Sequence, residues 1–448
     1  MNGYYILTEN TKATACPQMN NPTVKKLWHG FCLTMGEIDI APCDGFVFRL
    51  GSTQLPALEE GKEYALSVDA NGAAIVGRDY GGLLRGFMVL LMKIEYREKT
   101  LSIQYTQEQS AYKIQKRMIH ICVFPENDLY FIKKLIRLAA LCQYTHIVIE
   151  FWGMLQYDCL KELAWPHAFT KAQAKELINE CRDLGIEPIP MYNMFGHATA
   201  SRVRYGKHVV LDQNPTLQYL FTPDGWAWDI TSEETYDLLR RIRQELYDLF
   251  GETEYFHIGC DEAYYYVHCA ELHKQVPGYL HRLTTDVTAE GRKPMLWMDM
   301  ILERKDYPSE YYAFAGDGEG DKLLESLAPE SVMVDWQYNV NKAPVLSSVY
   351  LKDKGHDLLV ASWLKKPNYT ACIDTVTEHN LSGIMLTTWH TLKDDMHGIL
   401  GFAQTCGAKT FVWSVKRARE ETASLLRRIS FEGNTYEDCG WSKKQIEV

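Results

Sequence analysis

Short apolar runs alternate with amphipathic stretches along most of the chain. From Arg117 onward, each run is followed by apolar residues at helical spacing. The eight runs are Met118–Phe124, Thr145–Trp152, Ile186–Tyr192, Tyr255–Cys260, Pro294–Asp299, Ser331–Trp336, Asp357–Ser362 and Gly383–Trp389. Such nearly continuous apolar runs are typical of parallel strands that are buried on both faces. The pattern therefore predicts a (β/α)8 barrel over residues 113–430.

A doubly wound open sheet is the alternative for the same alternation of strands and helices. Open sheets that bind nucleotides carry a Gly-rich turn after a strand. None of the eight apolar runs is followed by that turn, so we favour the closed barrel.

The first 110 residues follow another pattern and predict a small α+β domain. Tyr64–Val68 and Ala73–Val76 lie on either side of a turn that contains Asn71-Gly72, a strong hairpin signal. Asp79 is then placed to cap a helix over Leu83–Ile94.

The remaining segments complete this organisation. Leu101–Tyr105 predicts a further strand, and the polar segment Gln107–Lys113 is expected to link the small domain to the barrel. Residues 431–448 are expected to form a C-terminal tail. Between Tyr192 and Glu233 lies a long connection that contains tryptophans, which indicates an ordered, functional loop.

Charge, hydropathy and cysteine content argue against nucleic acid and membrane partners and indicate a location. The 448 residues include 47 Lys and Arg against 58 Asp and Glu, a net charge of −11. Binding of nucleic acid needs clustered cations, so we expect no nucleic acid partner. No apolar stretch reaches about 18 residues, so no membrane span is expected. The absence of a basic-then-apolar leader and the twelve scattered cysteines favour a cytoplasmic protein with reduced thiols.

No metal or other cofactor is expected. His268, Cys269 and His273 contain ligand-type side chains, but neither their spacing nor a fourth ligand supports zinc. Solvated helix residues are the simpler interpretation of this cluster.

The C-terminal ends of the barrel strands should form the site. Besides Asp261 and Glu262, these ends place the following side chains at the mouth: Glu150, His197, His257, Trp297, Asp299, Trp336, Tyr338, Trp363 and Trp389. Indole faces pack on the C–H faces of sugar rings, and carboxyl groups bind hydroxyls or donate protons. The set predicts a small glycan or glycoside as the substrate.

The Asp261-Glu262 pair is the sharpest element of this set. Adjacent carboxylates repel each other, so one of them can keep a proton near neutral pH, as a glycosidic leaving oxygen requires. Strand alternation points His257 into the barrel below Asp261. A carboxylate pair at a helix start is the alternative, and the tryptophans at four other strand ends favour the catalytic interpretation.

The chain resembles glycoside hydrolase family 20, the β-N-acetylhexosaminidases. His257–Glu262, HIGCDE, is similar to the family signature His-x-Gly-Gly-Asp-Glu, and Ile189–Ala198, IPMYNMFGHA, resembles its third-strand motif. Lys116-Arg117-Met118 resembles the family's Arg-Gly at the first strand. Residues 64–86 look like the small domain that precedes the barrel in many members.

The resemblance implies an exo-acting, retaining enzyme that removes terminal β-linked GalNAc or GlcNAc. The 2-acetamido group of the substrate would attack the anomeric carbon and form an oxazoline-type intermediate. Glu262 would be the general acid and then the base, and Asp261 would bind the acetamido N–H. Arg117 would bind ring hydroxyls and His197 would support the site. The acetamido pocket would be walled by Trp297, Trp336 and Trp389.

Several positions depart from the family pattern. Cys260 replaces the second Gly of the signature, and His120 stands where many members have Asp. Ser362-Trp363 lacks the Tyr-x-Asp of the seventh strand, so Tyr338 or Tyr369 is the candidate replacement for that Tyr.

The eighth strand reads Trp389-His390-Thr391 instead of Trp-x-Glu. These departures resemble the cytoplasmic hexosaminidase D-like branch, which favours galactosaminides, and Arg117, Glu150 or Asp299 could then bind an axial hydroxyl. Two alternatives stay open: a different acetamido-assisted retaining glycosidase, and a non-catalytic sugar-binding or sensor protein on this scaffold. The oligomeric state is left undetermined.

Overall fold

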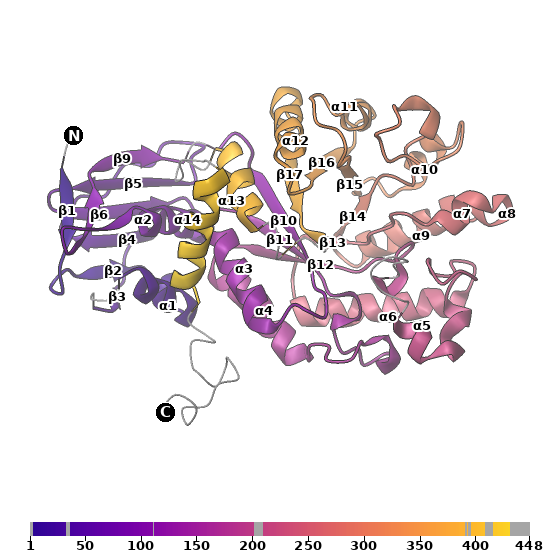
Figure 1. Cartoon of the computed structure of the whole chain (residues 1–448), viewed down its shortest axis with the longest axis horizontal. Helices are drawn as coiled ribbons and strands as arrows, with labels where there is room; N and C mark the ends of the chain where they lie inside the picture. The colour runs from indigo at the N-terminus through magenta and orange to yellow at the C-terminus, as the bar shows by residue number, and fades with distance from the viewer. Residues whose placement is uncertain are drawn as a thin grey trace.

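The chain from β10 to β17 forms a closed parallel barrel (Figure 1). The computed structural model describes residues 3–32, 36–110, 112–200, 209–389, 392, 396–407 and 415–430. The barrel strands are β10 (Lys116–Cys122), β11 (His146–Glu150), β12 (Glu187–Met191), β13 (Tyr255–His257), β14 (Lys293–Trp297), β15 (Val332–Trp336), β16 (Asp357–Ser362) and β17 (Gly383–Thr387). Strand β17 pairs in parallel with β10, which closes the sheet. The predicted (β/α)8 barrel is therefore confirmed.

Helices follow the strands in the predicted order. They are α3 (Leu129–Leu141), α4 (Lys171–Asp183), α5 (Val209–Gln213), α6 (Glu233–Phe250), α7 (Tyr264–His268), α8 (Ala270–His273), α9 (Val276–Ala289), α10 (Gly320–Ser326), α11 (Leu346–Asp353), α12 (Lys366–His379), α13 (Met396–Thr405) and α14 (Val415–Arg428). Local sequence sets several of the helix starts. The Asp128 carboxylate accepts the Phe131 N–H at 2.7 Å, and Thr170 forms a capping box with Gln173.

Inward-facing side chains fill the barrel up to its mouth. A buried apolar layer contains Met118, Val148, Ile189, Tyr255, Met295, Val332, Leu359 and Met385. Side chains alternate along a strand, so the next inward positions lie two residues further on. Four of these positions carry His120, Glu150, His257 and Trp297. The apolar layer thus closes the barrel below a polar and aromatic floor at the carboxyl ends of the strands.

The described residues of the N-terminal domain form two sheets and two α-helices. Its elements are β1 (Tyr4–Leu7), β2 (Ala13–Ala15), α1 (Pro22–Phe31), β3 (Ile38–Ile40), β4 (Phe46–Gly51), β5 (Tyr64–Asp69), β6 (Gly72–Gly77), α2 (Tyr80–Met92), β7 (Ile94–Arg97), β8 (Thr100–Gln104) and β9 (Thr106–Gln109). The strand orders are β1-β8-β7 and β3-β2-β4-β6-β5-β9. An α+β domain therefore precedes the barrel, as predicted.

Two local predictions hold in this domain and one is corrected. The β5–β6 hairpin forms, with the Asp69 carboxylate accepting the Asn71 N–H at 2.7 Å. Asp79 caps α2 by accepting the Gly82 N–H at 2.7 Å. The polar segment expected to be a linker instead begins as β9, which pairs with β5. Backbone pairing at a sheet edge needs no apolar pattern, which is why the sequence did not predict this strand.

Helix α14 joins the two parts of the molecule from the far end of the chain. It packs against α1 of the N-terminal domain and against α3 of the barrel (Figure 1). The Arg137 guanidinium of α3 donates to the carbonyl oxygen of Ile429 at 2.9 Å, just after α14. The predicted tail, 431–448, lies outside the described residues.

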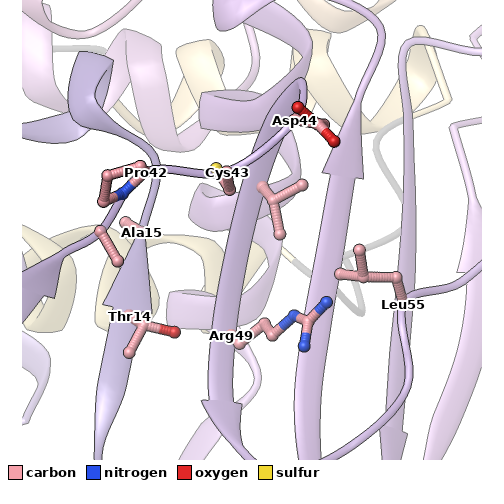
Figure 2. Close-up of a pocket in the computed structure, with 9 residues that line it drawn as sticks. Thr14, Ala15, Pro42, Cys43, Asp44, Arg49 and Leu55 are labelled. Atoms are coloured by element: carbon pink, nitrogen blue, oxygen red, sulfur yellow. The ribbon is translucent and has the colours of Figure 1, made fainter.

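A hollow of about 410 Å³ lies on the N-terminal sheet (Figure 2). Its lining includes Thr14, Cys43, Asp44, Arg49 and Leu55, which come from β2, β4 and neighbouring loops. It is not part of the barrel mouth. Among the described helices, none has the length and apolar character needed to cross a bilayer.

Candidate active site

The loop after β13 carries the two predicted catalytic carboxyl groups. Its backbone takes left-handed conformations at Gly259, Cys260 and Glu262, with φ of 69°, 76° and 50°. Left-handed backbone at non-glycine residues costs free energy and is concentrated at functional sites. Gly196 allows the neighbouring loop to approach, because a Cβ there would lie 2.0 Å from the Asp261 carbonyl oxygen.

Asn193 holds this loop from the end of β12. Its amide nitrogen donates to the Asp261 carboxylate, and its amide oxygen accepts the Cys260 N–H at 3.0 Å. The backbone oxygen of Asn193 in turn accepts the indole N–H of Trp228 at 2.9 Å. Asn193 was not among the predicted site residues, although it directly follows the third apolar run.

His197 brings the two carboxyl groups together. Its Nε2 lies 2.7 Å from Glu262 Oε2 and 3.6 Å from Asp261 Oδ2. The Glu262 side chain is 21% exposed and that of Asp261 only 5%. Glu262 is therefore the carboxyl group that a substrate oxygen or a water molecule can reach directly.

Burial raises the pKa of two carboxyl groups in this cluster, Asp261 and Asp299. It raises the pKa of Asp261 to about 6, against the opposing charge of His197. Glu262 and Glu150 add to the upward shift. Burial likewise raises the pKa of Asp299 well above its ordinary value, and the Asp261 carboxylate adds to this shift. The carboxyl groups whose pKa is raised are thus the two more buried ones, Asp261 and Asp299.

The floor of the site consists of buried imidazole, carboxyl and indole groups. His120 Nε2 lies 3.1 Å from Glu150 Oε2, and both side chains are fully buried. His257 lies below the Asp261 loop as predicted, and its Nδ1 accepts the Gly259 N–H at 3.1 Å. The Trp297 ring packs 4.4 Å from His257 and 6.0 Å from His120 between ring centroids.

Aromatic side chains from later strands form one wall of the mouth. The ring of Tyr338 lies 4.9 Å from Trp336 and 5.8 Å from Trp363. Its hydroxyl accepts the Trp389 indole N–H at 2.8 Å. The Trp389 ring lies 5.8 Å from Trp297, so the wall continues into the floor. The predicted aromatic residues therefore come together in one surface beside the carboxyl groups.

Sequence comparison identifies the family of the chain. Residues 153–393 match the family model described as glycosyl hydrolase family 20, catalytic domain. The match covers more than half of the chain. The chain belongs to glycosyl hydrolase family 20.

Solved structures of this family share the fold of the chain. The Flavobacterium johnsoniae chitobiase superposes with a TM-score of 0.68 at 16% identity, covering 96% of this chain and 70% of that one. The Streptomyces coelicolor A3(2) β-N-acetylhexosaminidase gives a TM-score of 0.67 at 14% identity, covering 99% and 95%. A curated relative, lacto-N-biosidase of Bifidobacterium bifidum, is 20% identical over 276 residues. That match covers 56% of this chain and 24% of the relative, so the chain spans about a quarter of its length.

Arg117 of this family 20 chain is not at the barrel mouth, which corrects the expectation that it binds sugar hydroxyls. It is the second residue of β10, so it lies at the amino end of the barrel, and strand alternation turns it outward. The residue is 3% exposed, and its guanidinium pairs with Glu63 of the N-terminal domain at 3.3 Å. It also donates to the carbonyl oxygen of Ile114 at 2.7 Å. Arg117 therefore joins the two domains.

The departures from the family pattern have partial structural explanations. Cys260 occupies a position with φ of 76°, the left-handed conformation that a Gly adopts freely. Tyr338 lies in the aromatic wall, whereas Tyr369 packs on Phe402 at 5.9 Å in the helical layer. Tyr338 is thus the better candidate for the missing Tyr. His390 and Thr391, which bear on the eighth strand, lie outside the described residues.

Asp299 contacts protein groups with both carboxylate oxygens. Oδ2 accepts the Glu262 N–H at 2.8 Å and Oδ1 accepts the Trp336 indole N–H at 2.9 Å. The residue is 1% exposed. Asp299 was predicted to bind substrate, whereas this geometry makes it a positioning residue that connects the Glu262 backbone to the aromatic wall.

Asp299→Asn is expected to lower glycosidase kcat by roughly 5- to 150-fold, because one buried N–H loses its acceptor at a cost of ~1–3 kcal/mol. The measurement is kcat, KM and Tm of the purified variant. Asp335→Asn is the control, since Asp335 is also a buried Asp but accepts rotatable hydroxyls from Ser347 and Ser348 at 2.6 Å. An unchanged kcat with a lowered Tm in Asp299→Asn would reduce its role to stability.

Proposed function

We propose that this family 20 chain is an exo-acting β-N-acetylhexosaminidase. The observation that carries the proposal is the adjacent Asp261 and Glu262 pair held around one imidazole, that of His197, at the carboxyl end of β13. The aromatic wall and floor lie beside the pair and contact each other through Trp389 and Trp297. Such a surface suits a sugar ring with an acetamido methyl group. The family assignment supports glycoside hydrolysis, and the terminal sugar is the finer part of the proposal.

The two carboxyl groups have different tasks in the proposed reaction. Glu262, the more exposed one, donates a proton to the glycosidic oxygen as the bond to the anomeric carbon breaks. Asp261 accepts the acetamido N–H and opposes the positive charge that develops as the acetamido oxygen attacks that carbon. Glu262 then removes a proton from the water that opens the oxazoline-type intermediate. Two inversions give net retention, as in the substrate-assisted exceptions to the two-carboxylate scheme.

The geometry favours this route over an enzyme nucleophile. Retaining enzymes with a nucleophile place a second carboxylate across the sugar from the acid, about 5–5.5 Å away. Here the second carboxyl group is that of Asp261, which lies near the same His197 nitrogen as Glu262. It also accepts a hydrogen bond from the Asn193 amide. It is therefore held on the same loop as the acid and around the same imidazole, where we place it to orient an acetamido group. This same placement argues for catalysis over a non-catalytic sugar-binding scaffold.

A panel of 4-nitrophenyl β-glycosides with and without a 2-acetamido group tests the proposal. We expect turnover of the N-acetylhexosaminides without added metal or nucleotide. Full activity on plain β-glucosides with none on 2-acetamido substrates would overturn it. Tight binding of N-acetylhexosamine without any turnover would favour the sugar-binding alternative.

The same panel tests the preference for the 4-hydroxyl epimer. We propose that galactosaminide turnover equals or exceeds glucosaminide turnover, as in the branch that the eighth-strand motif resembles. Glu150 is the remaining candidate for an axial hydroxyl, because Oε1 has no hydrogen-bond partner among the described residues. A gluco preference above tenfold in kcat/KM, about 1.4 kcal/mol, would contradict this.

A further inference from the structure

Three half-buried aromatic residues gather next to Glu262, outside the wall and floor described above. Trp226, Tyr264 and Phe314 are here called the aromatic ridge. Trp226 and Phe314 lie in the loops after β12 and β14, and Tyr264 begins α7, which follows β13. The Trp226 and Tyr264 rings lie 5.9 Å apart with an interplanar angle of 31°. Tyr264 and Phe314 meet edge to face at 5.2 Å. The ridge is thus one continuous group of aromatic rings from three separate segments of the chain.

The ridge contacts the residue proposed as the proton donor. The Trp226 indole N–H donates to the backbone oxygen of Glu262 at 2.6 Å, and its ring lies 4.6 Å from His197. The Tyr264 hydroxyl interacts electrostatically with the Glu262 carboxylate. Burial and this carboxylate raise the pKa of the Tyr264 hydroxyl, so it stays protonated and can donate. The ridge therefore adjoins the acid on the side of the β12–β14 loops.

The position of the acid fixes where a leaving group must lie. A proton passes from Glu262 to the leaving oxygen, so the group attached to that oxygen lies within van der Waals reach of the Glu262 surroundings. The aromatic wall proposed for the terminal sugar comes from the ends of strands β15 to β17, whereas the ridge follows strands β12 to β14. Aromatic faces bind the C–H faces of pyranose rings and other aromatic rings, and these three large side chains are partly exposed.

We propose that the aromatic ridge is the binding subsite for the leaving group, and that it selects aglycones with a flat apolar face, a second pyranose ring or an aryl group, over small alkyl groups. This inference rests on the proposed hexosaminidase activity. The wall and floor would then bind the terminal sugar, and the ridge would bind the group on the other side of the scissile bond.

Phe314→Ala tests the subsite most cleanly, because among the contacts recorded for the described residues its ring meets Tyr264 and neither carboxyl group. The substrates are the 4-nitrophenyl, methyl and β-linked disaccharide N-acetylhexosaminides. We expect kcat/KM to fall roughly 3- to 10-fold for the aryl and disaccharide substrates and to stay unchanged for the methyl glycoside.

Trp226 provides a second, graded test. Trp226→Phe keeps a stacking ring but loses the N–H to Glu262, whereas Trp226→Leu loses both. Only the Leu variant should lose the added selectivity for aryl over methyl glycosides. Tyr219→Ala is the control, since Tyr219 is 52% exposed and contributes nothing to the ridge.

Binding measurements separate failure of the subsite from failure of the hexosaminidase proposal. Calorimetry with 4-nitrophenyl and methyl N-acetyl-β-hexosaminides reports the aglycone contribution even if neither is hydrolysed. A stronger affinity for the aryl compound that disappears in Phe314→Ala supports the ridge in either case. Equal losses for aryl and methyl compounds in kcat/KM or in affinity would overturn it.

Discussion

Glu262→Gln should reduce hydrolysis of glycosides with alkyl or sugar leaving groups by roughly 10²- to 10⁴-fold, the contribution of a general acid. The amide keeps the size of the side chain and can still contact His197, but it has no acidic proton to transfer. A 4-nitrophenolate departs with little protonation, so the first step of its reaction should be far less affected.

The measurement is kcat/KM across a series of leaving groups of graded pKa, in the wild type and in Glu262→Gln. The variant should show a much steeper dependence on leaving-group pKa. Asp335→Asn, a buried Asp outside the site, should keep the wild-type slope. A uniform loss across the series would remove the proton-donor role from Glu262.

Asp261→Asn should reduce turnover of all 2-acetamido substrates by about 10²- to 10³-fold, as expected when preorganised charge stabilisation is lost. The Asn193 amide N–H would still require an oxygen at residue 261, so the new NH2 group would turn toward the substrate's own N–H. Two donors then face each other, and the charge that stabilises the oxazoline-type intermediate is absent. The loss should therefore be independent of the leaving group.

The pH profile provides an independent test of Asp261. Its ionised form is the one that accepts the acetamido N–H, and its pKa is raised to about 6. As the pH falls through about 6, the carboxylate takes up a proton and kcat/KM should fall with it. The residual kcat/KM of Asp261→Asn should lack this acid limb. An acid limb that persists unchanged would assign it to another group.

Local sequence determined the architecture of this chain. Eight apolar runs predicted the eight barrel strands because buried parallel strands need apolar side chains on both faces. The Asn71-Gly72 turn and the Asp79 cap were also readable, since each depends on backbone preferences and hydrogen bonds within a few residues. The end of a strand then located Asp261 and Glu262, because the mouth of a barrel lies at those ends.

Only the tertiary structure decided which side chains meet at the site. Asn193 and Trp226 contact the Asp261-Glu262 loop across dozens of residues, and no periodicity along the chain encodes such contacts. The prediction for Arg117 was wrong because the motif does not show where on the strand the residue lies. Arg117 is at the amino end of β10 and points outward to Glu63. Asp299 looked like a ligand for substrate until barrel closure brought the Glu262 N–H and the Trp336 indole to its oxygens. Sequence patterns report burial and local turns, whereas the direction and partner of a side chain at the mouth depend on how distant strands close around it.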